Sequence, residues 1–158
     1  MKVYLVQHAE AMSEDQNPNR PLTDLGRQHT AWVADVAVKL GVELEQIRHS
    51  GKTRAGETAE ILGEVLAPEE GVVAVSGLAP LDDVEPVAEE LDQASQPVLL
   101  VGHLPFMERL AGQMLVGDAH QPVIDFTNAG LVCLEKKDSR WQAVWILTPD
   151  MAELKSGM

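Results

Sequence analysis

The chain has 158 residues, of which 45% are hydrophobic and 23% charged, as in an ordinary globular protein. This length favours a single domain over residues 1–158, large enough to bury a core. The formal net charge of −13 argues against general nucleic-acid binding, which needs a cationic face on the protein.

Neither a secretory leader nor a membrane span is expected. The first residues lack a charged segment followed by a long apolar stretch, and no apolar run approaches the length of a bilayer span. Cys133 is the only cysteine, which excludes an intrachain disulfide, and its apolar surroundings favour a buried small side chain. We therefore expect a cytoplasmic protein that does not contact membranes.

The first predicted strand covers residues 3–6, a short apolar run that leads to His8. The polar stretch 10–20 indicates an exposed loop. Thr23 is a suitable N-cap for a helix that runs to about Leu40, and Gly41 is a suitable stop. This arrangement predicts a strand, a loop and a helix, with a histidine where the strand ends.

A second strand is expected over residues 47–50, followed by a turn and a helix that Ser50 or Thr53 would cap. Arg54 then falls in the first turn of that helix. Helix N-termini present free N–H groups and a positive dipole end, and an arginine adds a bidentate donor. The segment therefore predicts an anion-binding site.

A third strand is predicted over residues 72–75, and a helix with Pro86 in its first turn follows. The run 97–103 is apolar throughout, as expected for a parallel strand that is covered on both faces, and it ends at His103. A further helix opens after Leu104. The pattern of strands and helices repeats here, again with a histidine at the end of a strand.

The last third of the chain predicts a hairpin of strands over residues 130–135 and 141–147. Its alternation puts Trp141, Ala143, Trp145 and Leu147 on one face, where the tryptophans are more often core than a binding site. Residues from Thr148 on are expected to form a short tail.

Together these elements predict an α/β three-layer sandwich, a mainly parallel sheet flanked by helices on both faces. Ligands of open α/β sheets bind at the carboxyl ends of the strands. Three such ends would face one rim: His8, the turn at residues 50–54, and His103.

Three other kinds of site are weakly supported. The tetrapeptide S-G-K-T at residues 50–53 resembles the end of a P-loop, but Gln46 stands where that motif needs its first glycine. No G-x-S-x-G segment indicates a serine hydrolase. The five histidines form no close ligand pair, so no metal is expected, and three of them are predicted to be structural or on the surface: His29, His49 and His120.

Four ordered motifs carry a resemblance to a known family. They are L-V-Q-H-A at residues 5–9, R-P-L-T-D-L-G at 20–26, S-G-K-T-R-A-G-E-T-A at 50–59 and V-G-H-L-P at 101–105. In this order they resemble the histidine phosphatase (phosphoglycerate mutase-like) superfamily, and within it the small SixA-type phosphohistidine phosphatases. The resemblance covers residues 1 to about 150 and implies the fold of that superfamily.

The resemblance also implies a mechanism. His8 would attack phosphorus and become phosphohistidine, Arg54 and Arg20 would hold the phosphoryl oxygens, and His103 would donate hydrogen bonds to them. No cofactor is implied. Positioning and charge stabilisation supply most of the catalysis in such a transfer.

The sequence departs from the family pattern at the first motif, where Gln7 and Ala9 replace the arginine and glycine of R-H-G. We expect Gln7 to line the phosphate site as a weaker donor. Losing a charge-assisted hydrogen bond of about 1.5–3 kcal/mol would slow the reaction by about one to two powers of ten. Lys52, or Arg48 if it points to the rim, would compensate in part.

A general acid is also hard to find, because Asp82 and Asp83 are the nearest candidates and favour helix capping. Phosphohistidine needs little acid help, since imidazole leaves more easily than an alkoxide. The sequence therefore predicts a phosphatase acting on phosphohistidine of a protein. Two alternatives stay open: a small-molecule phosphomonoesterase of the same fold, or a phosphate- or phosphoprotein-binding module that lost turnover through Gln7.

Overall fold

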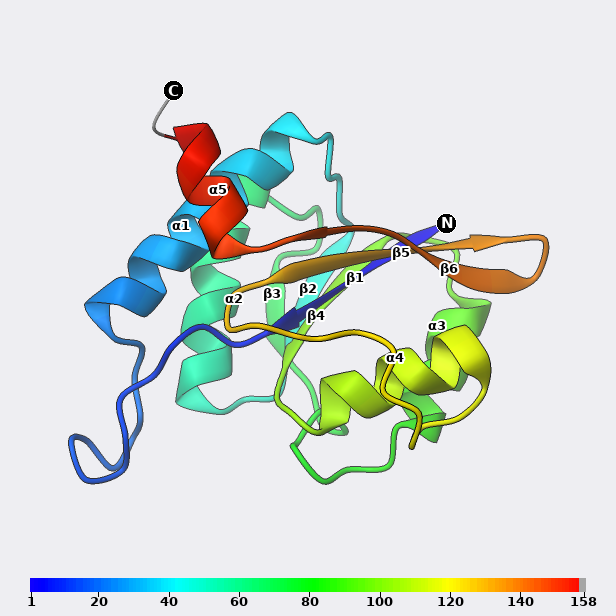
Figure 1. The fold of residues 1–158 in the computed structure, drawn as a ribbon, viewed down its shortest axis with the longest axis horizontal. Helices are drawn as coiled ribbons and strands as arrows, with labels where there is room; N and C mark the ends of the chain where they lie inside the picture. Colours follow the sequence, from blue (N-terminus) through cyan, green and yellow to red (C-terminus); the bar gives the residue numbers. More distant parts are fainter. Residues whose placement is uncertain (157–158) are drawn as a thin grey trace.

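Six strands form one sheet in the computed structural model, which describes residues 1–156 (Figure 1). The spatial order is β3-β2-β4-β1-β5-β6. The first four strands run parallel, and β5 and β6 are antiparallel to their neighbours. The strands are β1 (Lys2–Gln7), β2 (Gln46–His49), β3 (Val72–Ala74), β4 (Val98–Gly102), β5 (Leu131–Lys137) and β6 (Arg140–Leu147).

Helices cover both faces of the sheet, which confirms the predicted three-layer α/β fold (Figure 1). Strand side chains alternate between faces, so Tyr4 and Val6 join one buried cluster while Val3 and Leu5 join the other. The first cluster lies under α1 (Asp24–Lys39), α2 (Thr53–Leu66) and α5 (Pro149–Ser156), and the second under α3 (Glu85–Gln93) and α4 (Phe106–Val116).

The prediction of a tail after Thr148 is wrong, because that segment forms α5. The hydroxyl of Thr148 accepts a hydrogen bond from the backbone N–H of Met151 at 3.4 Å, and Pro149 stands at the first helical position. Ala152 is fully buried in the cluster under α1. A threonine followed by proline was thus a start signal, and packing against α1 stabilises this short helix.

The prediction that both tryptophans of β6 share one face is also wrong. Cys133 pairs with Trp145, but Leu134 pairs with Ala143, so Val144 is an extra residue in the ladder. This β-bulge reverses the alternation along the strand. Trp145 therefore packs against the cluster under α1, and Trp141 is buried in the cluster under α3 and α4.

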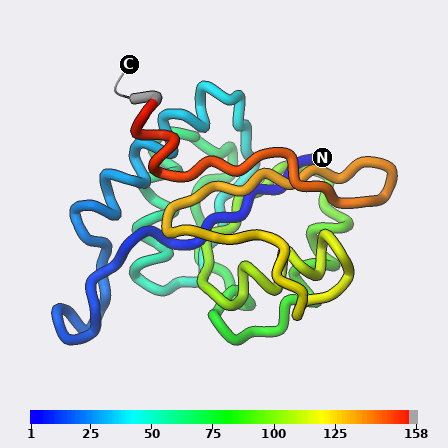
Figure 2. Tube along the Cα trace, in the orientation of Figure 1, coloured from blue at the N-terminus to red at the C-terminus, as the bar shows by residue number. Residues whose placement is uncertain are grey.

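The carboxyl ends of β1, β2 and β4 meet at one rim, as the sequence predicts. The backbone N–H of His8 donates to the carbonyl of Gly102 at 2.9 Å, which extends the pairing of β1 and β4. In Figure 2 the segment before β5 runs beside the exit of β1, where Ala129 N–H donates to Gln7 O at 2.9 Å. No helix within residues 1–156 has the length and apolarity that crossing a membrane requires.

Candidate active site

His8 lies just beyond β1 with its imidazole held by the backbone. Its Nδ1 is 2.8 Å from the carbonyl oxygen of Ala9, which can only accept, so Nδ1 carries the hydrogen. Burial lowers the pKa of His8, the bond to Ala9 opposes that shift, and Arg54 and Arg20 add to it. The ring is therefore neutral near pH 7, and its Nε2 has a free lone pair.

His103 follows β4 and lies against His8, with the two ring centroids 5.0 Å apart. The side chain is 2% exposed, and its Nε2 is 2.6 Å from the hydroxyl of Ser50. Burial is the largest cause that lowers the pKa of His103 to about 3, and the neighbouring His8, Arg54, Lys52 and Arg20 all act in the same direction, because each would repel a charged ring. His103 is thus a neutral imidazole beside the ring of His8.

Arg54 occupies the first turn of α2, as predicted, although neither Ser50 nor Thr53 caps this helix. Lys52 is the N-cap residue and makes no side-chain capping bond. The buried hydroxyl of Thr58 donates to Arg54 O at 2.8 Å and accepts from Ala9 N–H at 3.0 Å. One threonine therefore ties the start of α2 to the residue after His8.

Arg20 belongs to the loop that leads to α1, with a positive φ of 48°. Its Nε donates to the carbonyl of Met12 at 3.0 Å. Glu57 fixes this segment to α2, since it accepts from Leu22 N–H at 3.0 Å and pairs with Arg27 at 2.5 Å. The loop therefore holds Arg20 close enough for its charge to lower the pKa of His8 and Arg54.

Gly26 explains the glycine in the second motif. A Cβ at this position would lie 2.2 Å from the carbonyl oxygen of Glu10, which is not possible without moving the backbone. Thr23 caps α1 as predicted, accepting from Gly26 N–H at 3.0 Å. The absence of a side chain thus lets α1 begin directly against the loop after His8.

Among residues 1–156, the buried side-chain polar atoms without a hydrogen-bond partner are Gln7 Oε1, Arg54 Nε and His103 Nδ1. Such atoms are costly to bury. The nitrogen of Arg54 is a donor that a bound anion can satisfy, whereas the amide oxygen of Gln7 only accepts and needs a donor as its partner. All three belong to residues that the sequence assigned to the phosphate site. Gln7 itself ends β1, in register with Gly102 at the start of the His103 turn.

The remaining candidates are divided between the rim and other roles. Lys52 is exposed at the start of α2, and its charge lowers the pKa of His103. Arg48 bonds to Glu90 on α3 at 2.7 Å and is not available to the rim. Asp82 accepts from Ala79 N–H at 2.9 Å, and Asp83 accepts from Glu85 N–H at 3.0 Å. The N-cap of α3 is Val84, without a side-chain capping bond, so the prediction that either aspartate caps this helix is wrong.

The three other histidines lie outside this arrangement. His49 ends β2 and accepts from Gly51 N–H at 3.1 Å, the ring of His29 lies tilted against that of Trp32, and His120 is exposed. Within residues 1–156 no group of histidine, cysteine and carboxylate side chains has the geometry to hold a metal ion.

The sequence analysis gave no role in the phosphate site to four residues that shape it, and Ser50 was expected only as a possible helix cap. Asn128 donates to His8 O at 2.9 Å from the loop before β5, which carries no motif. The others, Ser50, Glu57 and Thr58, lie within the third motif at residues 50–59, so their place in that motif was the available signal.

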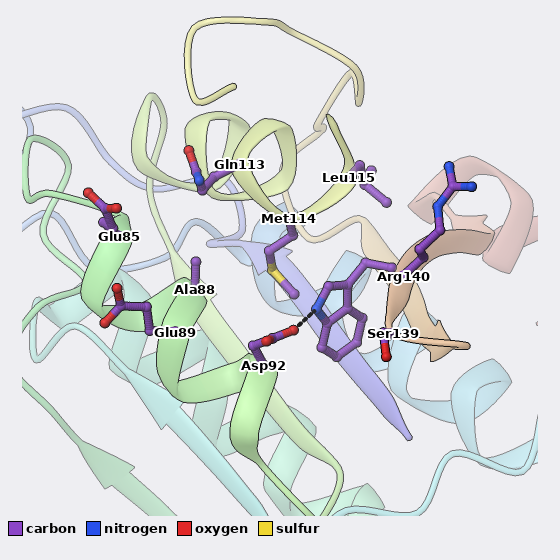
Figure 3. Close-up of a pocket in the computed structure, with 10 residues that line it drawn as sticks. Glu85, Ala88, Glu89, Asp92, Gln113, Met114, Leu115, Ser139 and Arg140 are labelled. Atoms are coloured by element: carbon purple, nitrogen blue, oxygen red, sulfur yellow. Dashed lines mark hydrogen bonds between the residues drawn. The ribbon is translucent and has the colours of Figure 1, made fainter. Parts of the chain in front are cut away.

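A separate groove of about 430 Å³ lies between α3, α4 and the turn of the β5–β6 hairpin (Figure 3). Two of its lining side chains bond to each other, since Asp92 accepts from Trp141 Nε1 at 3.3 Å, and Asp92 also pairs with Lys136 at 2.9 Å. None of the residues that line this groove is one of the predicted site residues.

The fold and the paired histidines at one rim define the histidine phosphatase class, and comparisons with known proteins agree. No family model matches the chain. The structure resembles that of the protein histidine phosphatase SixA complexed with tungstate, with a TM-score of 0.83, 25% identity, and coverage of 95% of this chain and 98% of that one.

Two curated relatives also match in sequence. The phosphohistidine phosphatase SixA of Escherichia coli is 27% identical over 123 residues, 75% of this chain and 76% of its own length. An uncharacterised protein of Picosynechococcus is 30% identical over 151 residues, 90% of both chains. The chain belongs to the histidine phosphatase superfamily, in its SixA-type branch.

Proposed function

We propose that the protein removes phosphate from a phosphorylated histidine of another protein, with His8 as the nucleophile. The observation that carries this proposal is the bond from His8 Nδ1–H to Ala9 O. It leaves the Nε2 lone pair of a neutral imidazole free at the rim, as a nucleophile requires. A cytoplasmic location and a role in signal transduction are part of the same proposal.

In the first step, Nε2 of His8 attacks phosphorus in line, the new N–P bond forms, and the N–P bond of the substrate breaks. The departing imidazole takes a proton from water. In the second step, water attacks phosphorus and loses a proton, which neutralises the hydroxide left by the first step; the bond to His8 breaks, and inorganic phosphate leaves as His8 returns to its neutral form. Splitting one displacement into two lowers each barrier.

The groups around His8 would hold the phosphoryl oxygens. Arg54 and His103 each have a buried nitrogen without a partner, and Arg20 brings a second guanidinium near both. Gln7 would contribute an amide where the family has an arginine. Electrostatic stabilisation in a site that is already organised is the largest single contribution of many enzymes.

The two carboxylates considered as general acids favour phosphohistidine over a phosphate ester. Asp82 accepts a hydrogen bond from the backbone N–H of Ala79, and Asp83 accepts one from that of Glu85 at the start of α3. An alkoxide leaving group needs a proton donor, whereas imidazole leaves with help from water alone. The small-molecule phosphomonoesterase is therefore the weaker alternative.

A phosphoprotein-binding module remains a second candidate because of one feature. Gln7 lacks the charge of the family's arginine, and its buried Oε1 has no partner. If the family's arginine acts chiefly on charge that develops during the reaction, its loss reduces the stabilisation of the transition state more than it reduces the affinity for phosphate.

The test is phosphate release from a histidine-containing phosphotransfer domain that has been phosphorylated chemically with phosphoramidate. The wild type is compared with His8→Ala and with His120→Ala, an exposed histidine that serves as the matched control. A phosphoserine peptide and a sugar phosphate are the substrate controls.

We expect release from the phosphohistidine domain that His8→Ala abolishes, by about three powers of ten or more, and that His120→Ala leaves unchanged. Release from the sugar phosphate at equal efficiency would replace the substrate by a small molecule. Binding of the phosphorylated domain without any release would make the protein a binding module.

A further inference from the structure

The hydroxyl of Ser50 contacts the second histidine of the site directly. Its Oγ lies 2.6 Å from Nε2 of His103, a short hydrogen bond between two uncharged groups. The same oxygen accepts from the backbone N–H of Lys52 at 3.3 Å. Ser50 is half-buried in the turn between β2 and α2, so the turn itself fixes the position of the hydroxyl.

His103 has one hydrogen to place on two ring nitrogens, because it is neutral at pH 7. Nε2 faces Ser50, while Nδ1 is buried and has no partner within residues 1–156. If Nε2 carried the hydrogen, Nδ1 would offer a lone pair to the site. The oxygens of an ionised phosphoryl group only accept, so a lone pair there would repel them.

The second arrangement has no such conflict. A serine hydroxyl has one hydrogen and two lone pairs, and Lys52 N–H already uses a lone pair. Donation of the hydroxyl hydrogen to Nε2 leaves the imidazole hydrogen on Nδ1. Both buried nitrogens without partners, Nδ1 of His103 and Nε of Arg54, are then donors for the same anion.

We propose that Ser50 is a positioning residue: its O–H donates to Nε2 of His103 and so fixes the Nδ1–H form that donates to the phosphoryl group. This inference rests on the proposed transfer of phosphate to His8. In this role Ser50 acts only through the ring of His103, which its Oγ contacts directly.

The test is two-bond ¹H–¹⁵N NMR of protein labelled at the histidine rings, which distinguishes protonated from unprotonated ring nitrogens. The spectra are recorded at pH 7 for the free protein and with saturating inorganic phosphate, and the His103 signals are assigned by their loss in His103→Gln. We expect Nδ1 of His103 to be protonated and Nε2 unprotonated in the wild type.

Three substitutions accompany the spectra. Ser50→Ala should give a mixture of both His103 forms and weaken phosphate binding by about threefold to tenfold, the worth of one neutral hydrogen bond. Ser50→Thr keeps the hydroxyl and should restore both readouts. Ser95→Ala, at an exposed serine just after α3, is the matched control.

A wild-type ring with its hydrogen on Nε2 overturns the proposal, and so does an unchanged ring in Ser50→Ala. Because the free protein already answers this question, a failure to bind phosphate would count against the proposed function and not against the role of Ser50. If phosphate affinity falls in Ser50→Ala and Ser50→Thr does not restore it, the role of Ser50 is only structural.

Discussion

The two ends of the sheet differ in how their polar groups are satisfied. At the rim beyond β1, β2 and β4, the side chains of Gln7, Arg54 and His103 each leave a buried polar atom without a partner. At the far end, beside the hairpin turn, Asp92 accepts from Trp141 in the groove of Figure 3 and also pairs with Lys136.

This difference distinguishes a ligand-binding site, at the rim, from a groove that needs no ligand. The groove is roomy, but within residues 1–156 none of its lining side chains leaves a buried polar atom without a partner, so nothing there requires a ligand. The rim is built from elements that hold polar groups in place without satisfying them. An unpartnered buried group costs of the order of 1–3 kcal/mol of stability, so such a cluster is expected only where binding a ligand requires it.

The largest effect on activity is expected for Arg54→Ala, because this change removes the guanidinium that carries one of the unpartnered atoms at the rim. We expect kcat/KM for a phosphohistidine domain to fall by about a hundredfold, as when one preorganised donor is lost. Arg140→Ala, an exposed arginine at the groove, removes the same charge at the other end and should leave kcat/KM unchanged. Equal effects of the two variants would refute the assignment.

Gln7→Arg should increase the phosphatase rate, because it restores the charge that the family has at the rim. A charge-assisted hydrogen bond of about 1.5–3 kcal/mol corresponds to an increase in phosphatase rate of about one to two powers of ten. Gln96→Arg adds the same charge at an exposed position before β4 and is the control. A rate that stays constant or falls in Gln7→Arg would mean that Gln7 does not line the phosphate site.

Acid should weaken the fold through the rim histidines. Burial lowers the pKa of His8 and His103 in the folded state, the latter to about 3, whereas the unfolded chain binds protons near pH 6.5. Their contribution to stability is complete above that pH and declines as pH falls towards the folded pKa. The free energy of unfolding should drop by up to about 1.4 kcal/mol per pH unit for each histidine.

Urea unfolding at pH 7 and pH 5 measures this decline. His103→Gln, which removes one of the two titrating rings, should flatten the dependence, whereas His120→Gln at an exposed position should not. The same slope in wild type and His103→Gln would show that His103 titrates normally in the folded protein.

The smallest effect is expected at the loop before α3. Asp83→Asn and Asp82→Asn should leave phosphohistidine hydrolysis within about twofold, because neither carboxylate serves as an acid in our proposal. Asp83→Ala should lower the free energy of unfolding by about 0.5–1.5 kcal/mol, since it loses one hydrogen bond from Glu85 N–H. A large loss of activity in either Asn variant would identify the missing general acid and favour a phosphate ester.

The rim was predictable from sequence because each of its parts ends a buried strand or begins a helix. His8 and His103 follow apolar runs, and Arg54 follows a turn, so the parallel topology alone brings them together. The alternation of strands and helices likewise predicted the three layers. What the motifs imply about catalysis stays a prediction.

The parts that escaped prediction depend on contacts between distant segments. Asn128 reaches the backbone of His8 from a loop without a motif, and the pairing of Ser50 with His103 joins two strand ends. The bulge at Val144 changes the ladder by a single residue, which periodicity does not reveal. Packing against α1 decided the helix after Thr148, where the local signal was only a threonine and a proline.

The bulge at Val144 also hinders edge-to-edge strand pairing between copies of this chain. β6 is the outer strand of the sheet, with Val144 46% exposed and Ile146 38% exposed, and a flat edge of this sort is a template for the strand of another chain. The extra residue interrupts the regular row of N–H and C=O groups and bends the strand. A change that removed it would straighten this edge and make the protein prone to aggregation.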